Sequence, residues 1–505
     1  MKHLSEESRC LVDGQIYYLN PMVIDLPEVR IIDSFRSSFF SFGSCFAIHM
    51  SNSLQKLGFS TYSDDRVCFH YTTKSLLEIL NRMKSGTEYG AGDLYYHKNG
   101  RQVVSPFHRA MFEEGEGAEL RLLKKMNALT AIARSNLQQA DIVFLTLGTA
   151  TYLELNKTRR VICHGGGISF EDYSIKNETC DEIYAELGSI YTALCEIIQK
   201  NFHLVLTISP QRYNWDQIAN GSILSNNIDK SKLTVAVDRF VNSHRGADIE
   251  YFPSYEIVID ELRNYETFQN NHKDYLHVST PHTTNYTINR FLLSHCSKEV
   301  IDTILFYKEK IVPLDKRLYF EPLTQIGAEL KNTVAYLGLK SDRLGCGYFV
   351  RRLKEILSRH NLDSYTKEIS GYETSESILS NIFERVDNDI EKWIKGKKRI
   401  IVYGAGFHTD LFMRNTRLGL SNIVAFVDAK YKYVKRIYGV NVISPDEMLR
   451  FSPEILFISS ASFQEQISKN IISENRQSKF VLYNIYRHYR EIIHIQDELR
   501  RRYRG

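Results

Sequence analysis

The sequence of 505 residues has no CxxC pair and no long apolar run, and its charge is nearly balanced. The eight irregularly spaced cysteines predict neither a metal site nor a disulfide framework, so we expect a reducing compartment. Without an apolar run of about 18 residues, no transmembrane segment is expected. The N-terminus, MKHLSEESRC, is too polar for a signal peptide. These absences predict a cytoplasmic protein.

The sequence also lacks internal repeats and low-complexity tracts. A formal net charge of +4 does not favour nucleic acid as a partner. With 43% hydrophobic and 25% charged residues, the composition is that of an ordinary globular protein. A chain of this length is expected to form two or more domains, because a single hydrophobic core rarely serves so many residues.

From about residue 30 the chain alternates strand-like and helix-like segments, which predicts an α/β fold. In FFSFGSCFAIHM, residues 39–42 form a buried strand, Gly43 permits a turn, and residues 47–57 have helical spacing. ADIVFLTLGTATY and FHLVLTISPQRY are two further strands with polar loops after them. Loops after parallel strands meet at one sheet edge, so we expect all three to converge.

Four segments are expected along the chain. The charged, helical stretch after the first α/β pattern predicts a connector, and KKRIIVYGAGFHTDLFMRN begins a second series of βα units. The basic tail, which ends in RRRYRG, is most simply a solvated helix end, and attraction to an anionic membrane or polysaccharide is the alternative. The segments are a first α/β domain (1–320), which carries the candidate catalytic residues described below, a helical connector (321–395), a smaller α/β domain (396–485) and a basic C-terminal helix (486–505).

Ser44 is the candidate nucleophile. A strand-to-helix turn exposes its hydroxyl, and the amides at the helix N-terminus can stabilise an oxyanion. A serine in this position is also typical of a simple N-cap. Cys45 is the competing nucleophile, since helix N-termini favour thiolates, but we expect its side chain to point inward.

A serine hydroxyl needs a base and a group that orients that base. The segment NHKDYLHVS supplies Asp274 and His277, three residues apart on one face of a turn. His272 is an alternative base, although it has no following acid at this spacing. The alternative to catalysis is an exposed loop with incidental polar residues.

These pieces resemble the GSCFA family, a bacterial group similar to SGNH hydrolases. FGSCFA at 42–47 carries the family signature, and LGTA, CH, SPQR and YFPSYEIVIDELR follow in the family's order. The resemblance covers about residues 30–300. It implies an SGNH-hydrolase-like (flavodoxin-like) fold, in which a parallel sheet is sandwiched by helices.

The resemblance also implies roles for individual residues. Ser44, Asp274 and His277 become the catalytic residues, and Ser44, Gly148 and Thr149 the oxyanion-hole candidates. Ala150 stands where SGNH enzymes carry an asparagine, so a donor from Asn226 or Asn227 is the alternative.

Two further residues are candidates for substrate contact. Neighbouring residues on a strand point to opposite faces, so Cys163 and His164 are not expected to act as a pair. We assign His164 to the substrate and Cys163 to the core. Arg212 is expected to face an anionic or hydroxyl-rich substrate, with a structural ion pair as the alternative.

The VYGAG turn resembles the opening of a Rossmann-like βαβ unit. Gly404 and Gly406 would let backbone amides approach a phosphate, and Asp428 falls where an acidic residue contacts a ribose. A third glycine is missing, because His408 or Thr409 takes that place. Such domains accompany sugar-modifying enzymes of bacterial surface polysaccharides and bind a nucleotide, a nucleotide-sugar or CoA, or act as scaffolds.

Together these features predict acyl-ester chemistry on a carbohydrate, as an esterase or an O-acetyltransferase of bacterial surface-polysaccharide metabolism. No cofactor is certain; acetyl-CoA as acyl donor and a nucleotide at the second domain are the candidates. The alternative is a non-catalytic scaffold that binds a glycan or a nucleotide-sugar. The acyl group, the acceptor and the oligomeric state are not predicted.

Overall fold

The computed structural model describes residues 23–97, 100–163, 165, 167–212, 221–262, 282–321, 323–362, 364–365, 375–429, 431–460, 464–474 and 480–489. The chain divides into two compact units, each drawn from separate stretches of sequence. The first unit takes residues 1–87, 94–112 and 136–372, and the second takes 88–93, 113–135 and 373–505.

The first unit is built on a five-stranded, all-parallel sheet in the order β11-β10-β6-β1-β2. Its strands are β1 (Ser38–Gly43), β2 (Ser60–Tyr62), β6 (Ile142–Leu147), β10 (His203–Ile208) and β11 (Ile249–Tyr251). The α/β class and the parallel sheet are therefore confirmed. Gly43 and Thr207 both pair with Thr146 of the middle strand, so the carboxyl ends of β1, β6 and β10 lie level.

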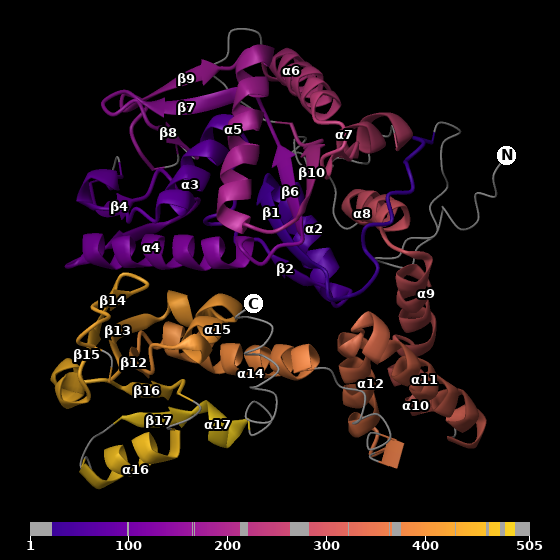
Figure 1. Ribbon diagram of the computed structural model, residues 1–505, viewed down its shortest axis with the longest axis vertical. Helices are drawn as coiled ribbons and strands as arrows, with labels where there is room; N and C mark the ends of the chain where they lie inside the picture. Colours follow the sequence, from indigo (N-terminus) through magenta and orange to yellow (C-terminus); the bar gives the residue numbers. More distant parts are fainter. Residues whose placement is uncertain are drawn as a thin grey trace. The chain divides into compact units, whose positions relative to one another are not determined.

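Helices cover this sheet, which lies between α5 and α8 in Figure 1. α2 packs against α8, while α5 packs against both α3 and α6. The helices are α2 (Cys45–Lys56), α3 (Thr73–Ser85), α5 (Cys180–Ile198), α6 (Gly221–Ser243) and α8 (His282–His295). Strand side chains alternate between the two faces, and Phe39, Phe144 and Val205 join the core that contains α2 and α8.

Further elements complete the first unit. They are β3 (Tyr95–Tyr96), β4 (Gln102–Val104), β7 (Thr151–Leu155), β8 (Val161–Ile162), β9 (Tyr173–Asn177), α7 (Ser254–Glu256), the π-helix η2 (Ile257–Glu261), α9 (Lys298–Phe306), the π-helix η4 (Tyr307–Ile311), α10 (Leu314–Phe320), α11 (Leu323–Leu344) and α12 (Gly347–Arg359). β7 pairs antiparallel with both β8 and β9. The stretch expected to be a connector is helical, but α11 and α12 contribute Leu337 and Phe349 to the core of the first unit.

The second unit contains a six-stranded sheet in the order β14-β15-β13-β12-β16-β17, in which only β14 and β15 pair antiparallel. Its strands are β12 (Arg399–Tyr403), β13 (Asn422–Val427), β14 (Arg436–Ile437), β15 (Val440–Ile443), β16 (Ile455–Ile458) and β17 (Val481–Asn484). Its helices are α14 (Ser375–Lys395), α15 (Phe407–Asn415), η6 (Arg417–Leu420), η7 (Pro445–Phe451), α16 (Gln464–Glu474) and α17 (Ile485–His488). The predicted succession of βα units is present.

Two earlier stretches belong to the second unit. They bring η1 (Ala91–Asp93), most of β5 (Phe112–Glu114) and most of α4 (Ala118–Leu137). A side chain at Gly419 would overlap with Ile132 of α4, so η6 and α4 are in close contact. The second unit is therefore not a contiguous C-terminal segment. None of the helices in the described parts of the chain is long and apolar enough to cross a membrane.

Candidate active site

Ser44 lies at the turn from β1 into α2, where it caps the helix. Its backbone is extended, and its hydroxyl accepts a hydrogen bond from the amide of Phe46 at 3.3 Å. The preceding Gly43 has φ +132°, and a Cβ there would overlap with the carbonyl oxygen of Thr146. Only glycine adopts this conformation without strain, so Gly43 makes the tight turn possible.

The hydroxyl of Ser44 donates a hydrogen bond to the hydroxyl of Ser209 at 3.0 Å. Ser209 directly follows β10; its amide donates to the carbonyl of Leu147 at 2.7 Å, and its Oγ accepts from the amide of Gln211 at 3.2 Å. Because β1 and β10 flank β6, the two hydroxyls meet over the end of the middle strand. The expected convergence of the loops after these strands is thus present.

The expected exposure of the two candidate nucleophiles is reversed. Ser44 is only 1% exposed, whereas Cys45 is half-buried and lines a cavity. The reason is that the Ser44 side chain turns over the sheet toward Ser209, while Cys45 starts the outward face of the first turn of α2. Burial raises the pKa of the Cys45 thiol and the Arg109 guanidinium opposes this effect, so the thiol stays protonated near neutral pH.

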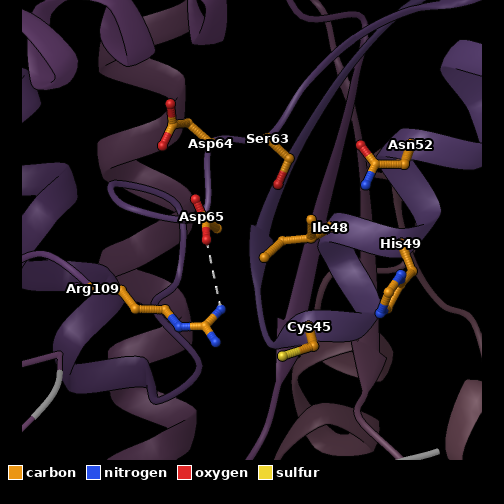
Figure 2. A pocket seen from close by; sticks show the side chains of 8 residues that line it. All are labelled: Cys45, Ile48, His49, Asn52, Ser63, Asp64, Asp65 and Arg109. Atoms are coloured by element: carbon orange, nitrogen blue, oxygen red, sulfur yellow. Dashed lines mark ion pairs between the residues drawn. The ribbon is translucent and has the colours of Figure 1, made fainter. Parts of the chain in front are cut away.

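The cavity has a volume of about 410 Å³ and opens beside the first two turns of α2 (Figure 2). The helix contributes Cys45, Ile48, His49 and Asn52. The opposite wall is formed by Ser63, Asp64, Asp65 and Arg109. The cavity thus lies between α2 and the loop that follows β2, on the side of Ser44 away from β10.

The two predicted oxyanion donors that follow β6 are engaged in other contacts. The amide of Gly148 donates to the carbonyl of Tyr71 at 2.7 Å. The hydroxyl of Thr149 donates to Asp229, and its oxygen accepts from the amide of Thr151 at 3.1 Å. By contrast, the amide of Ser44 lies 3.4 Å from the carbonyl of Thr146, which is at the long end of the hydrogen-bond range.

Asp229 of α6 organises a buried polar cluster at this edge of the sheet. Its carboxylate accepts from Thr151 Oγ1 and from Asn177 Nδ2, each at 2.8 Å, in addition to Thr149. The neighbouring Lys230 donates to the carbonyl of Gly148. Burial lowers the pKa of Lys230 to about 7, with Asp229 acting in the opposite direction. The cluster fixes the loop after β6 to α6.

Of the remaining predicted residues, the structure describes Arg212, Asn226 and Asn227. Asp274, His277 and His272 lie outside the described residues, as does His164. Arg212 is half-buried, and its charge opposes the burial that raises the pKa of Tyr255. Asn226 is buried and Asn227 is exposed, so only Asn226 lies on the inner face of α6 with Asp229.

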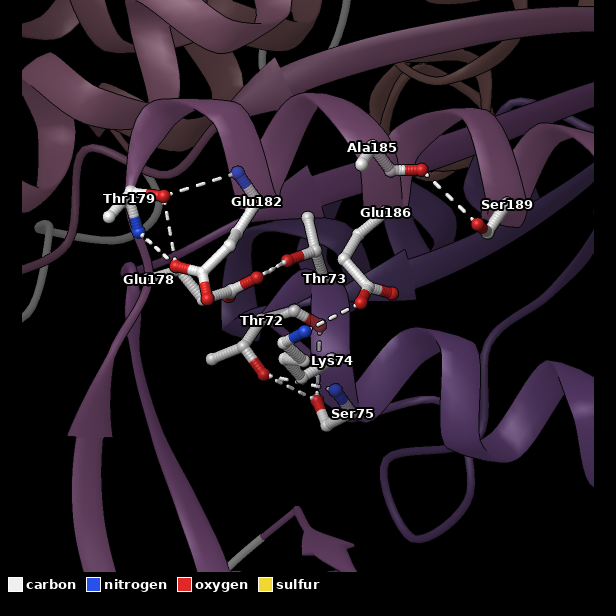
Figure 3. A network of polar contacts seen from close by, with 10 residues as sticks. All are labelled: Thr72, Thr73, Lys74, Ser75, Glu178, Thr179, Glu182, Ala185, Glu186 and Ser189. Atoms are coloured by element: carbon white, nitrogen blue, oxygen red, sulfur yellow. Dashed lines mark hydrogen bonds and ion pairs between the residues drawn. The ribbon is translucent and has the colours of Figure 1, made fainter.

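A second buried network ties the start of α3 to the start of α5 (Figure 3). The hydroxyl of Thr73 lies 2.7 and 2.8 Å from the two carboxyl oxygens of Glu178. Burial raises the pKa of Glu178 to about 7, while the hydrogen bond from Thr73 acts against this shift. The amide of Glu178 donates to the carbonyl of Ala150 at 2.9 Å, so the network also holds the loop after β6.

Two buried histidines lie close to the same loops. Burial lowers the pKa of both His70 and His108 to about 3, so both rings are neutral at physiological pH. The loop that carries His70 also supplies the carbonyl of Cys68 to the amide of Gly43 at 2.9 Å. This loop therefore contacts the turn that carries Ser44 through its backbone.

In the second unit, Gly404, Gly406 and Asp428 are brought together at the carboxyl ends of the adjacent strands β12 and β13. Gly404 has φ +118°, and Gly406 caps α15 with open space where a side chain would stand. The Asp428 carboxylate accepts from the amide of Ala405 at 2.8 Å. This contact engages the Ala405 amide with the carboxylate, and the binding of a phosphate or a ribose at this loop stays a prediction.

Sequence reasoning did not assign roles to Ser209, Asp229 and Lys230. Ser209 lies in the SPQR segment. The sequence pattern predicted a role for Arg212 of this segment and none for its serine. Asp229 and Lys230 are adjacent charged residues on the buried face of α6, which continues with Leu233 and Val237. A charged pair on that face was the signal that could have identified this cluster.

Comparisons with known proteins match two stretches of the sequence. A family model described as GSCFA family matches residues 38–291, which include Ser44, Gly148 and Ser209. A model described as C2185-like, N-terminal, matches residues 396–481. A search of curated proteins finds no match. Because the first model covers half of the sequence and begins at the strand that leads into the turn of Ser44, this chain belongs to the GSCFA family.

Proposed function

We propose that the first unit is an SGNH-type serine enzyme that transfers or hydrolyses acyl esters on a carbohydrate. The observation that carries the proposal is the position of Ser44. Its hydroxyl stands at the N-terminus of α2, at the level carboxyl ends of three parallel strands, and is oriented by Ser209. Ligands of open parallel sheets bind at this edge.

The proposed chemistry has two steps. Ser44 Oγ attacks the acyl carbonyl carbon, its proton passes to a base, and the leaving group takes that proton. The leaving group is an alcohol when the C–O bond of an ester breaks, and the CoA thiol when the C–S bond of acetyl-CoA breaks. Water, in an esterase, or a sugar hydroxyl, in an O-acetyltransferase, then gives its proton to the base and attacks the acyl-enzyme; the bond from the acyl carbon to Ser44 Oγ breaks and Oγ takes the proton back. His277, held by Asp274, is the proposed base. Both lie outside the described residues and enter through the resemblance to SGNH enzymes.

For the oxyanion we favour the backbone amide of Ser44, at the N-cap of α2. The Gly148 amide is donated to Tyr71 and the Thr149 hydroxyl to Asp229, whereas the Ser44 amide makes only a long contact. The partial positive charge of a helix N-terminus adds to this stabilisation. Asn226 on the inner face of α6 is the proposed side-chain donor.

The second unit is proposed to be a Rossmann-like domain that presents a nucleotide, a nucleotide-sugar or CoA. The supporting observation is that Gly404, Gly406 and Asp428 come together at adjacent strand ends. A role in making a bacterial surface polysaccharide follows by analogy with similar two-domain enzymes. Acetyl-CoA is the proposed acyl donor if the reaction is transfer.

A non-catalytic glycan-binding scaffold is the second candidate. The burial of Ser44, at 1% exposed, favours this candidate, because an acyl group must reach Oγ. The two candidates differ in their reaction with a fluorophosphonate probe, which labels an activated serine.

The test compares the full-length protein with Ser44→Ala and Cys45→Ala. Under the enzyme proposal the probe labels the wild type and Cys45→Ala but not Ser44→Ala. Turnover of an aryl acetate, measured with and without acetyl-CoA and oligosaccharides, should fall by roughly four to six orders of magnitude in Ser44→Ala. Activity in Ser44→Ala with none in Cys45→Ala would reverse the assignment of the nucleophile.

A further inference from the structure

We propose that the cavity beside the first turns of α2 binds a neutral, hydroxyl-rich ligand, namely one sugar residue of the glycan. Its volume of about 410 Å³ lies within the range of roughly 300–1,000 Å³ that is usual for small-molecule sites. It also lies at the carboxyl edge of β1 and β2, where ligands of parallel sheets are found. The link to catalysis rests on the proposed function, but the binding itself does not.

The charges around the cavity cancel in pairs. Asp64 is held by Arg66 through two contacts, Nε–Oδ1 at 2.9 Å and Nη2–Oδ2 at 2.5 Å. Asp65 faces Arg109 across 3.9 Å. Burial and the charge of Lys56 lower the pKa of His49, so its ring is neutral at pH 7. The wall therefore offers no net charge to attract an anion or a cation.

The same wall retains hydrogen-bonding capacity. The Asp65 side chain is 54% exposed, and 3.9 Å is too long for a direct hydrogen bond between its carboxylate and Arg109. Carboxylate, guanidinium and amide groups each present two polar atoms in a plane, and Asn52 supplies the amide on the opposite wall. Such paired polar atoms can contact two adjacent hydroxyls of a sugar ring. Ile48 offers an apolar surface to the C–H face of the ring (Figure 2).

The position of the cavity relative to Ser44 indicates which residue along a glycan chain the cavity would hold. The Ser44 hydroxyl points toward Ser209 and β10, whereas the cavity opens on the β2 side. A sugar in the cavity therefore cannot be the residue that carries the reacting ester. It would be a neighbouring residue of an extended glycan, so the cavity would select oligomers over monosaccharide esters.

Cys45 allows binding to be measured without any turnover. In the Ser44→Ala variant, the rate at which methyl methanethiosulfonate modifies Cys45 is followed by peptide mass spectrometry. Glucose, galactose and N-acetylglucosamine are the probes, and sodium acetate and choline are the charged controls. A bound sugar covers the thiol, so the rate should fall by a factor of 1 + [L]/Kd, about threefold at twice the Kd. The exposed Cys195 serves as an internal reference and should be unaffected.

The matched variant is Asp65→Ala, whose side chain is more than half exposed and whose loss should not prevent folding. Protection by a neutral sugar that disappears in Asp65→Ala supports the proposal. Protection by none of the three sugars, by acetate or choline instead, or to the same extent in Asp65→Ala would overturn it. Sugar protection in a protein whose wild type shows no ester turnover would count against the proposed function and not against the sugar site.

Discussion

The hydroxyl of Ser44 donates to the hydroxyl of Ser209 across the carboxyl end of β6, at a distance of 3.0 Å. Both side chains are buried, at 1% and 0% exposed. The contact fixes the rotamer of the candidate nucleophile before any substrate arrives. Ser209 would then act as a positioning residue for the reaction.

Replacing Ser209 should therefore slow acylation without weakening substrate binding. In Ser209→Ala, kcat for an aryl acetate should fall about tenfold, which corresponds to about 1.4 kcal/mol, with KM nearly unchanged. Ser209→Thr keeps a hydroxyl and should recover most of the rate. A Ser209→Ala variant with wild-type kcat would show that the contact is incidental.

Gly43→Ala should prevent stable folding of the first unit. The residue has φ +132°, and a Cβ would lie 2.7 Å from Cβ of Thr146. Strain and overlap together should cost roughly 3–5 kcal/mol. Gly188→Ala in α5 is the control, since its Cβ would meet no atom within 4 Å, and it should gain roughly 0.5–1 kcal/mol. Chemical denaturation of both variants measures the difference, and equal stability would contradict it.

Glu178→Gln should stabilise the protein at pH 8 and have little effect at pH 4. The pKa of Glu178 is about 7 in the folded chain and 4.5 in the reference state. Between these values the unfolded chain releases its proton and the folded chain keeps it, so wild-type stability falls as the pH rises. The neutral glutamine removes this loss, which is up to about 3 kcal/mol above pH 7.

Glu182→Gln is the matched control, and it should show the opposite trend. Hydrogen bonds from the amide and hydroxyl of Thr179 lower the pKa of Glu182, so its stabilisation is present above the unfolded pKa and lost as the pH falls. The residue is exposed, and the loss at pH 7 should stay below about 1 kcal/mol. Thermal unfolding from pH 4 to 8 measures the stability of both variants. If the two variants showed the same dependence of stability on pH, the opposite pKa shifts of Glu178 and Glu182 would be refuted.

Ile132→Ala in α4 should destabilise the second unit. Ile132 is 4% exposed and lies in close contact with Gly419. The resulting cavity should cost roughly 2–5 kcal/mol. Leu76→Ala in α3 is the control, because it empties a buried position of the first unit. Hydrogen exchange of β12 and β13 should rise in Ile132→Ala only, and unchanged exchange there would contradict the grouping of α4 with this unit.

The strands and the glycine turns could be predicted because they depend on local pattern. Residues 39–42 are an apolar run followed by Gly43, and both the strand and the turn are present. The exposure of Ser44 and Cys45 could not be predicted, because it depends on Ser209, which lies 165 positions away in the sequence. The membership of α4 in the second unit also depends on long-range packing that periodicity does not report.

The split composition of the second unit has a consequence for protein synthesis. Ile132 leaves the ribosome before Gly419 by about 290 residues, or roughly 15–60 s at 5–20 residues per second. During this interval the part of α4 that contacts η6 has no partner from the C-terminal strands. A nascent chain can thus complete the second unit only after its last strand, β17, has been synthesised, and a chaperone that holds α4 would protect it until then.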